Sequence, residues 1–391
     1  MGTATQCVVL IAVVSIHQQK SGTDMNEKLI LLPIQIVEQD DGVILKRGLE
    51  QVLIPDSNAL LIIRVIQKAL LQRPCSGDEL LELFAAPARP LIGSLLEYLR
   101  KKRFLLPQHE VGAHQNDGQE SAQDVFYWHF NQHQEQVAAA LNQRRWLFVG
   151  VNLLNEKLLQ AMLAEGLENY AVLDDPMLRN ITLFNDEHQL ISPFWQQQRQ
   201  RFIDEDELLA GRAGAGEFGF VVAASEFGSF YLIERWNEFA VTNKLVFYPA
   251  VLQNMVGYAG PLVIPGETAC FACLKARQNS HSNQFSEKRL TEKHAFAGQK
   301  VAAYHQSMLL MLAAVAQFDL LKFKTNIQWE TGTLCEVDLL GGAMTRRKLL
   351  KAPRCPVCSG LATMPLVNIR KQLTPSDAWD EIRQTVGHHE D

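Results

Sequence analysis

The sequence predicts an α/β protein in which a small winged-helix-like module precedes a doubly wound parallel sheet. Three observations support this prediction. Residues 29–106 have the pattern of short strands followed by three helices, residues 145–250 alternate strand and helix, and two Cys-x-x-Cys pairs come after the alternation. A chain of 391 residues also exceeds the usual size of one compact unit, so we expect two or three domains.

The winged-helix-like module is expected over residues 29–106. Ile, Val and Leu are frequent on both sides of the turn Asp40-Asp41-Gly42, which is typical of short antiparallel strands. Apolar residues then recur at helical spacing, and Ser76 with Glu79 forms a capping box before a second, short helix. A third helix is predicted over Arg89–Arg103 and ends in four consecutive basic residues.

The ends of the chain and one internal segment lie outside the predicted domains. Residues 1–28 are predicted to be an appendage, because MNEKLILLPIQIVEQ from Met25 has the pattern of the start of a folded domain. The apolar stretch Val8–Ile16 lacks the basic start of a secretory signal, so none is predicted. Residues 107–123 are polar and predict a linker, and residues 361–391 predict a peripheral tail. No apolar run reaches the roughly 18 residues of a membrane span, so we expect a cytoplasmic protein without a membrane partner.

A Rossmann-type domain that includes a zinc site is expected over residues 124–360. Its four predicted strands are apolar and separated by helical segments; they cover residues 145–151, 169–175, 218–225 and 244–252. Such alternation indicates parallel strands joined by crossover helices. A further long helix is predicted over residues 301–322, whereas residues 185–217 are too polar for an assignment.

Charge and cysteine content exclude some classes of function. The chain has 37 basic and 43 acidic residues, a net charge of −6, which disfavours nucleic acid as the main partner. Its seven cysteines are odd in number and four of them form two close pairs, which argues against a disulfide framework. The alternatives for a cytoplasmic protein are metal binding and redox chemistry.

Cys270, Cys273, Cys355 and Cys358 are predicted to bind one structural zinc ion. Each Cys-x-x-Cys pair places two thiols on one tight turn, so both sulfurs can reach an ion at about 2.3 Å, and two such turns complete a tetrahedral shell. The alternative is two unrelated pairs, one of them redox-active as in thioredoxin. Neither pair lies between a strand and a helix of a thioredoxin-like unit, which disfavours that alternative.

The turn after the first strand of a parallel αβ sheet is where phosphate normally binds, and glycines there let the backbone approach it. In this chain only Gly150 is present, and bulky side chains occupy Val151–Leu154. Asp174 ends the second strand, where an acid binds a ribose or caps a turn. The glycine-rich residues 211–216 precede a strand instead of opening a helix. We therefore assign Gly150 and Asp174 to a degenerate nucleotide site and expect ATP to bind weakly or not at all.

Together these features resemble the ThiF-like superfamily of ubiquitin-activating-enzyme-like adenylating proteins. Two segments carry a closer resemblance to the ocin-ThiF-like partner proteins of azoline-forming cyclodehydratases: GPLVIPGETACFACLKAR at Gly260–Arg277 and APRCPVCSG at Ala352–Gly360. With the front module, the resemblance covers roughly residues 29–360. Adenylating members have a glycine-rich loop and a Mg-binding Asp after the third strand, whereas this chain has Ser225-Glu226-Phe227 at that place.

The resemblance implies that residues 29–106 are a leader-peptide recognition element. The leader of a precursor peptide would add as a strand beside Glu50, Gln51, Val52, Leu53 and Ile54, in a groove walled by the third helix. An open sheet edge offers unpaired backbone groups, which makes this mode of binding reasonable. Arg100 and Lys101 would suit an acidic leader. The alternative is that these basic residues only stabilise the end of their helix.

We therefore expect a non-catalytic binding protein. By resemblance it captures a precursor leader and presents the peptide to a YcaO-type cyclodehydratase, which makes thiazole- or oxazole-type azolines in the biosynthesis of a bacteriocin or microcin. The alternative function is an ATP-dependent adenylating or peptide-modifying ThiF-like enzyme. A transcription regulator with an N-terminal winged-helix module is a third hypothesis, which the acidic net charge disfavours. Whether the chain forms a homodimer stays open.

Overall fold

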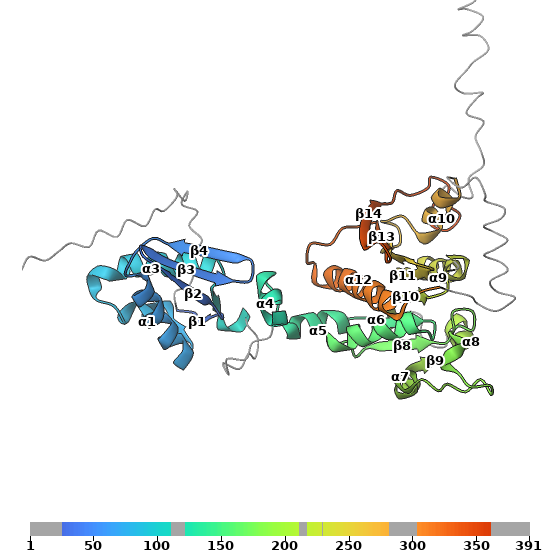
Figure 1. The fold of residues 1–391 in the computed structure, drawn as a ribbon, viewed down its shortest axis with the longest axis horizontal. Coiled ribbons are helices and arrows are strands. Elements are labelled where there is room, and N and C mark those ends of the chain that lie inside the picture. The colour runs from blue at the N-terminus through green and yellow to red at the C-terminus, as the bar shows by residue number, and fades with distance from the viewer. Residues whose placement is uncertain (1–25, 111–121, 211–216, 229, 281–302, 361–391) are drawn as a thin grey trace, which may run out of the picture. The chain divides into compact units, whose positions relative to one another are not determined.

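The computed structural model describes residues 26–110, 122–210, 217–228, 230–280 and 303–360. Most of the predicted appendage, most of the linker, the glycine-rich residues 211–216 and the predicted tail lie outside these ranges. The described chain forms two compact units (Figure 1). The N-terminal unit contains the described residues up to Gln143 together with residues 162–168 and 319–329; the second unit contains the others.

The N-terminal unit contains two small antiparallel sheets. The first has the order β5-β1-β6, with β1 at Lys28–Leu31, β5 at Cys75–Ser76 and β6 at Leu105–Pro107. The second has the order β2-β3-β4 and comprises β2 at Gln35–Gln39, β3 at Gly42–Arg47 and β4 at Glu50–Ile54. Two-residue turns join its strands, as the Asp40-Asp41 turn predicts.

Helices α1 (Ala59–Gln72), α2 (Gly77–Glu82) and α3 (Arg89–Lys101) complete the predicted strand-then-helix module. The capping box is confirmed: the Ser76 hydroxyl accepts a hydrogen bond from the Glu79 amide, and the Glu79 carboxylate accepts one from the Ser76 amide. All three helices contribute buried apolar residues to one core with the strands, and its buried members lie between Leu29 and Leu105. The module therefore has its own hydrophobic core.

The remaining described elements of the N-terminal unit are helices α4 (Ala122–His129) and α5 (Gln134–Asn142) and short 3-10 helices at Ala86–Ala88 and Gln108–Glu110. Trp128 of α4 packs with Ile30, Leu32 and Leu106 in a second cluster.

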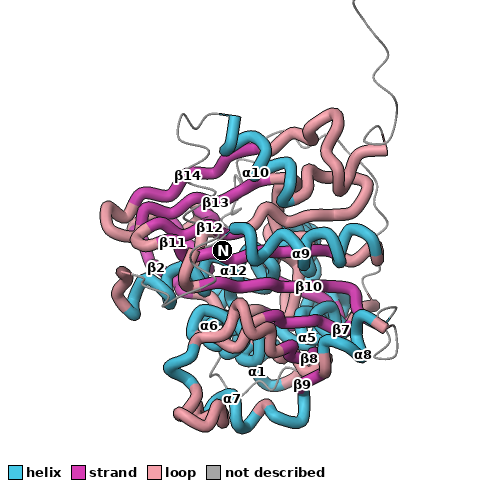
Figure 2. Tube along the Cα trace, turned by 90° about the vertical axis from the view of Figure 1, so that its right-hand side faces the viewer, coloured by secondary structure: helices cyan, strands magenta, loops and turns pink. Residues whose placement is uncertain are grey.

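The second unit is built on an eight-stranded sheet in the order β14-β13-β12-β11-β10-β7-β8-β9, which Figure 2 shows from one edge to the other. Its five parallel strands are β7 (Arg145–Val149), β8 (Tyr170–Leu173), β9 (Phe202–Ile203), β10 (Phe218–Ser225) and β11 (Val246–Gln253). Three antiparallel strands extend it: β12 (Val256–Ala259), β13 (Thr333–Asp338) and β14 (Ala343–Lys348). The predicted parallel sheet is confirmed, and its antiparallel extension and β9 are additions.

Helices connect the strands of this sheet: α6 (Leu153–Ala164), α7 (Pro193–Gln197), α8 (Glu205–Leu209), α9 (Phe230–Thr242), α10 (Phe271–Ser280) and α12 (Gln306–Thr325), with 3-10 helices at Ile181–Leu183 and Arg199–Arg201. Among the described residues, α12 alone is long and apolar enough to cross a membrane by length and composition, and 39% of its apolar stretch is buried. Core helices of soluble proteins pass the same test, so this is weak evidence for a membrane span.

Strand β7 is the centre of the parallel sheet. Its residues Trp146, Leu147, Phe148 and Val149 are fully buried, because both faces of a parallel sheet are covered by helices. Strands β8 and β9 lie on one side of β7, and β10 and β11 lie on the other. The strand order therefore reverses between β7 and β10. In open α/β sheets the crevice for ligands forms at this point, beyond the carboxyl ends of the two strands.

Candidate functional site

The four predicted ligand cysteines come together in the second unit. Their sulfur atoms all lie within 4.8 Å of one another. The Cys270 sulfur lies 3.5 Å from that of Cys355 and 3.9 Å from that of Cys273, and the sulfurs of Cys273 and Cys358 are 3.5 Å apart. Four thiolates around one tetrahedral ion would be about 3.8 Å apart if each metal–sulfur bond is about 2.3 Å long. The cluster therefore fits a metal ion.

Two different turns present these thiols. Cys270 precedes α10 and Cys273 lies in its first turn, where the Phe271 amide is fixed by a 2.9 Å hydrogen bond to the buried side chain of Asn237. Cys355 and Cys358 lie on a turn after β14, closed by a 3.1 Å hydrogen bond from the Ser359 amide to the Cys355 carbonyl. Anchored turns of this kind hold both pairs at coordination distance.

The surroundings of the thiols affect their protonation. Burial raises the pKa of the Cys270 thiol, and burial also raises the pKa of Cys358 to about 11. Burial acts on Cys355 in the same direction, but backbone hydrogen bonds from Cys358 and Val357 favour its thiolate and lower its pKa. Without an ion, Cys270 and Cys358 therefore hold their protons at neutral pH. A cation that binds here has to displace them.

The second candidate site lies where the strand order reverses. Gly150 follows β7 with a φ of +104°, and a Cβ atom there would lie 2.8 Å from the Asn152 side chain and 3.1 Å from the Ala224 carbonyl. The positive φ and the close neighbouring atoms require a glycine at position 150, as in a phosphate-binding loop. Here, however, the neighbouring atoms belong to the protein and not to a phosphate. The Asn152 amide group donates to the carbonyl oxygens of Leu178 at 3.0 Å and Ala224 at 2.8 Å.

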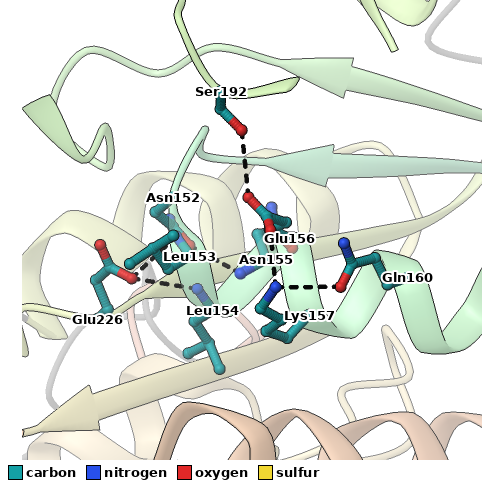
Figure 3. A network of polar contacts seen from close by, with 9 residues as sticks. All are labelled: Asn152, Leu153, Leu154, Asn155, Glu156, Lys157, Gln160, Ser192 and Glu226. Carbon is teal, nitrogen blue, oxygen red and sulfur yellow. Dashed lines mark hydrogen bonds and ion pairs between the residues drawn. The ribbon is translucent and has the colours of Figure 1, made fainter. Parts of the chain in front are cut away.

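A buried carboxylate caps the helix that follows this loop. The Glu226 Oε2 atom accepts hydrogen bonds from the backbone amides of Leu153 at 2.9 Å and Leu154 at 3.2 Å (Figure 3). The next amide, that of Asn155, donates to the Asn152 side-chain oxygen at 2.8 Å. Glu226 is fully buried. The first amides of α6, which bind phosphate in nucleotide sites of this fold class, therefore already have acceptors within the chain.

Neighbouring polar groups hold Glu226 in place. Its other oxygen, Oε1, accepts a short hydrogen bond from the side chain of Asn180, whose own oxygen caps the 3-10 helix at Ile181–Leu183. Burial, followed by the charge of Glu226, raises the pKa of Tyr304 to about 12, so that hydroxyl stays protonated. Glu156 in the first turn of α6 instead pairs with Lys157 at 2.8 Å (Figure 3).

Asp174, the predicted ribose-binding acid, is paired within the chain. Its carboxylate accepts two hydrogen bonds from Arg179, at 3.0 and 2.7 Å. The neighbouring Asp175 is fully buried and accepts hydrogen bonds from the Trp236 indole and the Arg235 guanidinium, each at 2.7 Å. Both acids at the end of β8 thus serve as local structural acceptors, the alternative role that the sequence left open for Asp174.

The predicted peptide-binding strand β4 is an edge of its sheet. It pairs with β3, and among the described residues no other strand pairs with it. Because a two-residue turn joins the strands, Arg47 and Glu50 form the first hydrogen-bonded pair, and alternation then directs the amides of Gln51 and Leu53 to the open side. Val52 and Ile54 are buried in the core of the module, whereas the Leu53 side chain is 54% exposed.

The two basic residues predicted to contact a peptide differ in their surroundings. The Arg100 side chain is only 14% exposed and lies 3.2 Å from the Glu27 carboxylate, whereas Lys101 is exposed. Arg100 is thus an ion-pair partner within the module, and Lys101 is the better placed of the two to meet a ligand.

Sequence reasoning found the four cysteines, Gly150 and the β4 edge, but it did not find the acceptors at the start of α6. Glu226 was noticed as a replacement for a metal-binding Asp, not as a helix cap. Asn152 and Asn155 were visible as polar residues in an apolar loop, which is the signal that could have revealed the network. The partners of the Asn152 amide group, the carbonyls of Leu178 and Ala224, lie 26 and 72 residues away and are known only from the fold.

No family model matches the sequence, and no curated protein matches it. Solved structures do match. Escherichia coli MccB with succinimide aligns with a TM-score of 0.60 and 16% identity over 85% of this chain and 99% of that one. Microcin C7 biosynthetic enzyme MccB in complex with N-formylated MccA gives a TM-score of 0.61 and 15% identity over 85% and 100%. A heterocyclase in complex with substrate and cofactor gives 0.55 and 14% over 85% and 40%. At these identities the likeness shows a shared Rossmann-type fold.

Proposed function

We propose that this chain is a leader-peptide-binding, zinc-containing ThiF-like protein. It presents a ribosomally made precursor peptide to a YcaO-type cyclodehydratase, which forms thiazole- or oxazole-type azolines in the biosynthesis of a bacteriocin-type product. The observation that carries the proposal is the open edge of β4 in a module with its own core. The shared fold supports it, because MccB has been solved with its peptide MccA and a heterocyclase with its substrate.

Peptide capture follows from the chemistry of a sheet edge. The outward amides of Gln51 and Leu53 and the carbonyls of the same residues can bond to an extended peptide, and such bonds tolerate many sequences. Exposed side chains of the same module would supply selectivity. Exposed Leu53 offers an apolar contact, and Lys101 offers a positive charge. The chain thereby binds the leader and leaves the modified part of the precursor to the partner enzyme.

Zinc is the ion proposed for the cysteine cluster. Four thiolates in tetrahedral arrangement with no open position are typical of structural zinc. The ion would connect α10 with the turn after β14, two segments that lie 85 residues apart at Cys270 and Cys355. Its role is to hold the fold, and the proposal assigns it no part in catalysis.

An adenylating enzyme is the alternative function, since one MccB structure contains ATP. The network at α6 disfavours it here, because Glu226 and Asn152 occupy the amides and the loop where a triphosphate would bind. Micromolar ATP affinity of the purified chain, or pyrophosphate exchange by the chain alone, would select the enzyme instead. The proposal places the protein in the cytoplasm; sedimentation velocity would decide whether it is a homodimer.

The direct test is binding of the cognate precursor peptide, a short chain rich in Cys, Ser, Thr and Gly. Fluorescence anisotropy of its labelled leader should show saturable binding to the full chain and comparable affinity for a fragment of residues 26–110. N-methylation of single leader amides should weaken binding at alternate positions, because alternate amides face β4. A leader that binds equally well whichever amide is methylated is not a β-strand addition. A folded fragment that ignores the leader contradicts the proposal outright.

A further inference from the structure

The start of α6 has the backbone amides of an anion-binding site, and the anion bound there is a side chain of the protein itself. The amides of Leu153 and Leu154 converge on one oxygen of Glu226, at 2.9 and 3.2 Å. These amides carry the positive end of a helix of 12 residues, where a negative group is favoured. Glu226 reaches them from the end of β10, on the other side of the point where the strand order reverses.

The carboxylate is a built part of this site. Glu226 is fully buried, and its second oxygen is fixed by the Asn180 side chain. Gly150, at φ +104°, allows the Asn152 side chain to approach to a distance that a Cβ atom would prevent. Asn152 in turn satisfies the Asn155 amide and two carbonyl groups. The backbone amides at the start of α6 therefore surround an oxyanion that is a covalent part of the chain.

We infer that Glu226 is a built-in anion that occupies a phosphate-type binding site, so that removal of its carboxylate converts α6 into a binding site for a free phosphate oxyanion. Carboxylate and phosphate oxygens accept the same backbone hydrogen bonds and respond to the same helix field. While Glu226 is in place, a second anion would meet its charge and find the amides engaged. The inference concerns the parallel-sheet unit and does not depend on leader capture.

The consequence for the protein is that its sheet crevice does not respond to phosphate-bearing ligands. A cap from β10 to α6 is present at all times, so the crevice has one state whatever the cellular concentration of nucleotide. The buried amides at the helix start also have acceptors when no ligand is bound. A buried amide without an acceptor would lower the stability of the fold.

The test compares the wild-type chain with Glu226→Ala and Glu226→Gln, using orthophosphate and pyrophosphate at constant ionic strength. Calorimetry and thermal melting are the two measurements. We expect no saturable response of the wild type, saturable binding with a rise in melting temperature for Glu226→Ala, and no binding for Glu226→Gln, whose amide oxygen still fills the position. Ligands that bind only the folded state raise its melting temperature.

The matched control is Asp204→Ala. Asp204 also accepts amide hydrogen bonds at a helix start, at 2.8 and 3.2 Å, but α8 is short and its first turn contains three further acids. Its removal should create no phosphate response. A folded Glu226→Ala protein without saturable binding, or phosphate binding by the wild type, would overturn the inference. If Glu226→Ala does not fold alone, its refolding yield should rise with phosphate over chloride, and an unchanged yield overturns the inference as well.

Discussion

Single polar side chains connect distant segments of the parallel-sheet unit. The side chain of Asn152 bonds to Leu178, Ala224 and Asn155, and Glu226 bonds to the first amides of α6. These groups are buried, so each hydrogen bond replaces one that water would otherwise make. The net gain of a bond is only about 1 kcal/mol, but a buried group left without its partner costs about 1–3 kcal/mol. Removal of one partner of such a hydrogen bond is therefore a more sensitive test of its contribution to stability than removal of both.

At Asn152, the usual equivalence of Asn and Asp at a helix start should not hold. Asp and Asn are about equally good N-cap residues. Asn152→Asp should nevertheless lower the free energy of unfolding by about 2 kcal/mol or more, because its second oxygen would face the carbonyl oxygens of Leu178 and Ala224. Urea unfolding measures the change. The control Asp204→Asn, at the exposed start of α8, should stay within about 0.5 kcal/mol of wild type.

Cys270 is a fully buried member of the cysteine cluster. Cys270→Ser should release the bound metal and lower the melting temperature, because a structural ion stabilises only the folded state. Metal content per chain and thermal melting are measured together. Cys335→Ser, a buried cysteine outside the cluster, should keep the metal. A metal-free Cys270→Ser protein with the wild-type melting temperature would refute the structural role.

Metal binding should depend on pH in one direction. Burial raises the pKa values of Cys270 and Cys358, so the ion-free cluster holds protons that binding must release. Affinity should therefore fall as the pH is lowered from about 8 to 5 and protons compete more strongly. Competition with a chromogenic zinc chelator at several pH values measures the trend. Affinity that is constant or rises on acidification would show that thiolates do not bind the ion.

At the scale of elements, the important feature is that β4 is an open edge while β2 forms the other edge of the same sheet. Gln51→Pro should weaken leader binding severely without unfolding the module, since it removes an amide that faces outward and no bond to β3. The matched change is Glu38→Pro in β2, whose amide also faces outward by the same alternation. Anisotropy with the labelled leader measures both variants, and circular dichroism checks their folding. Equal loss in the two variants would exclude β4 as the specific edge.

Elements with a strong local signal were predictable. The capping box at Ser76 and Glu79, the alternating strands of the sheet and the two Cys-x-x-Cys turns all lie within a few residues of their own signals. Strand β9 has only two residues, and the pairing of β12 to β14 is set by contacts across the sheet. Strand β14 is exposed along its whole length, so it lacks the apolar alternation that marks a strand. Such strands can be assigned only from the folded structure, in which their neighbouring strands are present.

At the scale of the whole molecule, the chain contains a module with an open sheet edge and a mainly parallel sheet in which Glu226 caps the helix beside the crevice. The sequence predicted the strand-then-helix module, the parallel sheet and the two cysteine pairs, whose sulfur atoms the fold brings together. It attributed the expected weakness of a nucleotide site to bulky residues after Gly150, whereas the structure adds Glu226, 73 residues beyond Leu153, as the group that holds the helix amides. A partner at that separation cannot be inferred from spacing along the chain.

The measurement that tests the central claim most directly is reconstituted azoline formation, followed by mass spectrometry of the precursor. The partner YcaO enzyme should dehydrate the precursor efficiently only when this chain is added and the precursor retains its leader. Gln51→Pro should reduce that stimulation, and Glu38→Pro should not. If the YcaO enzyme reaches the same rate without this chain, or if this chain alone modifies the precursor with ATP, the protein is not a non-catalytic presenter of the peptide.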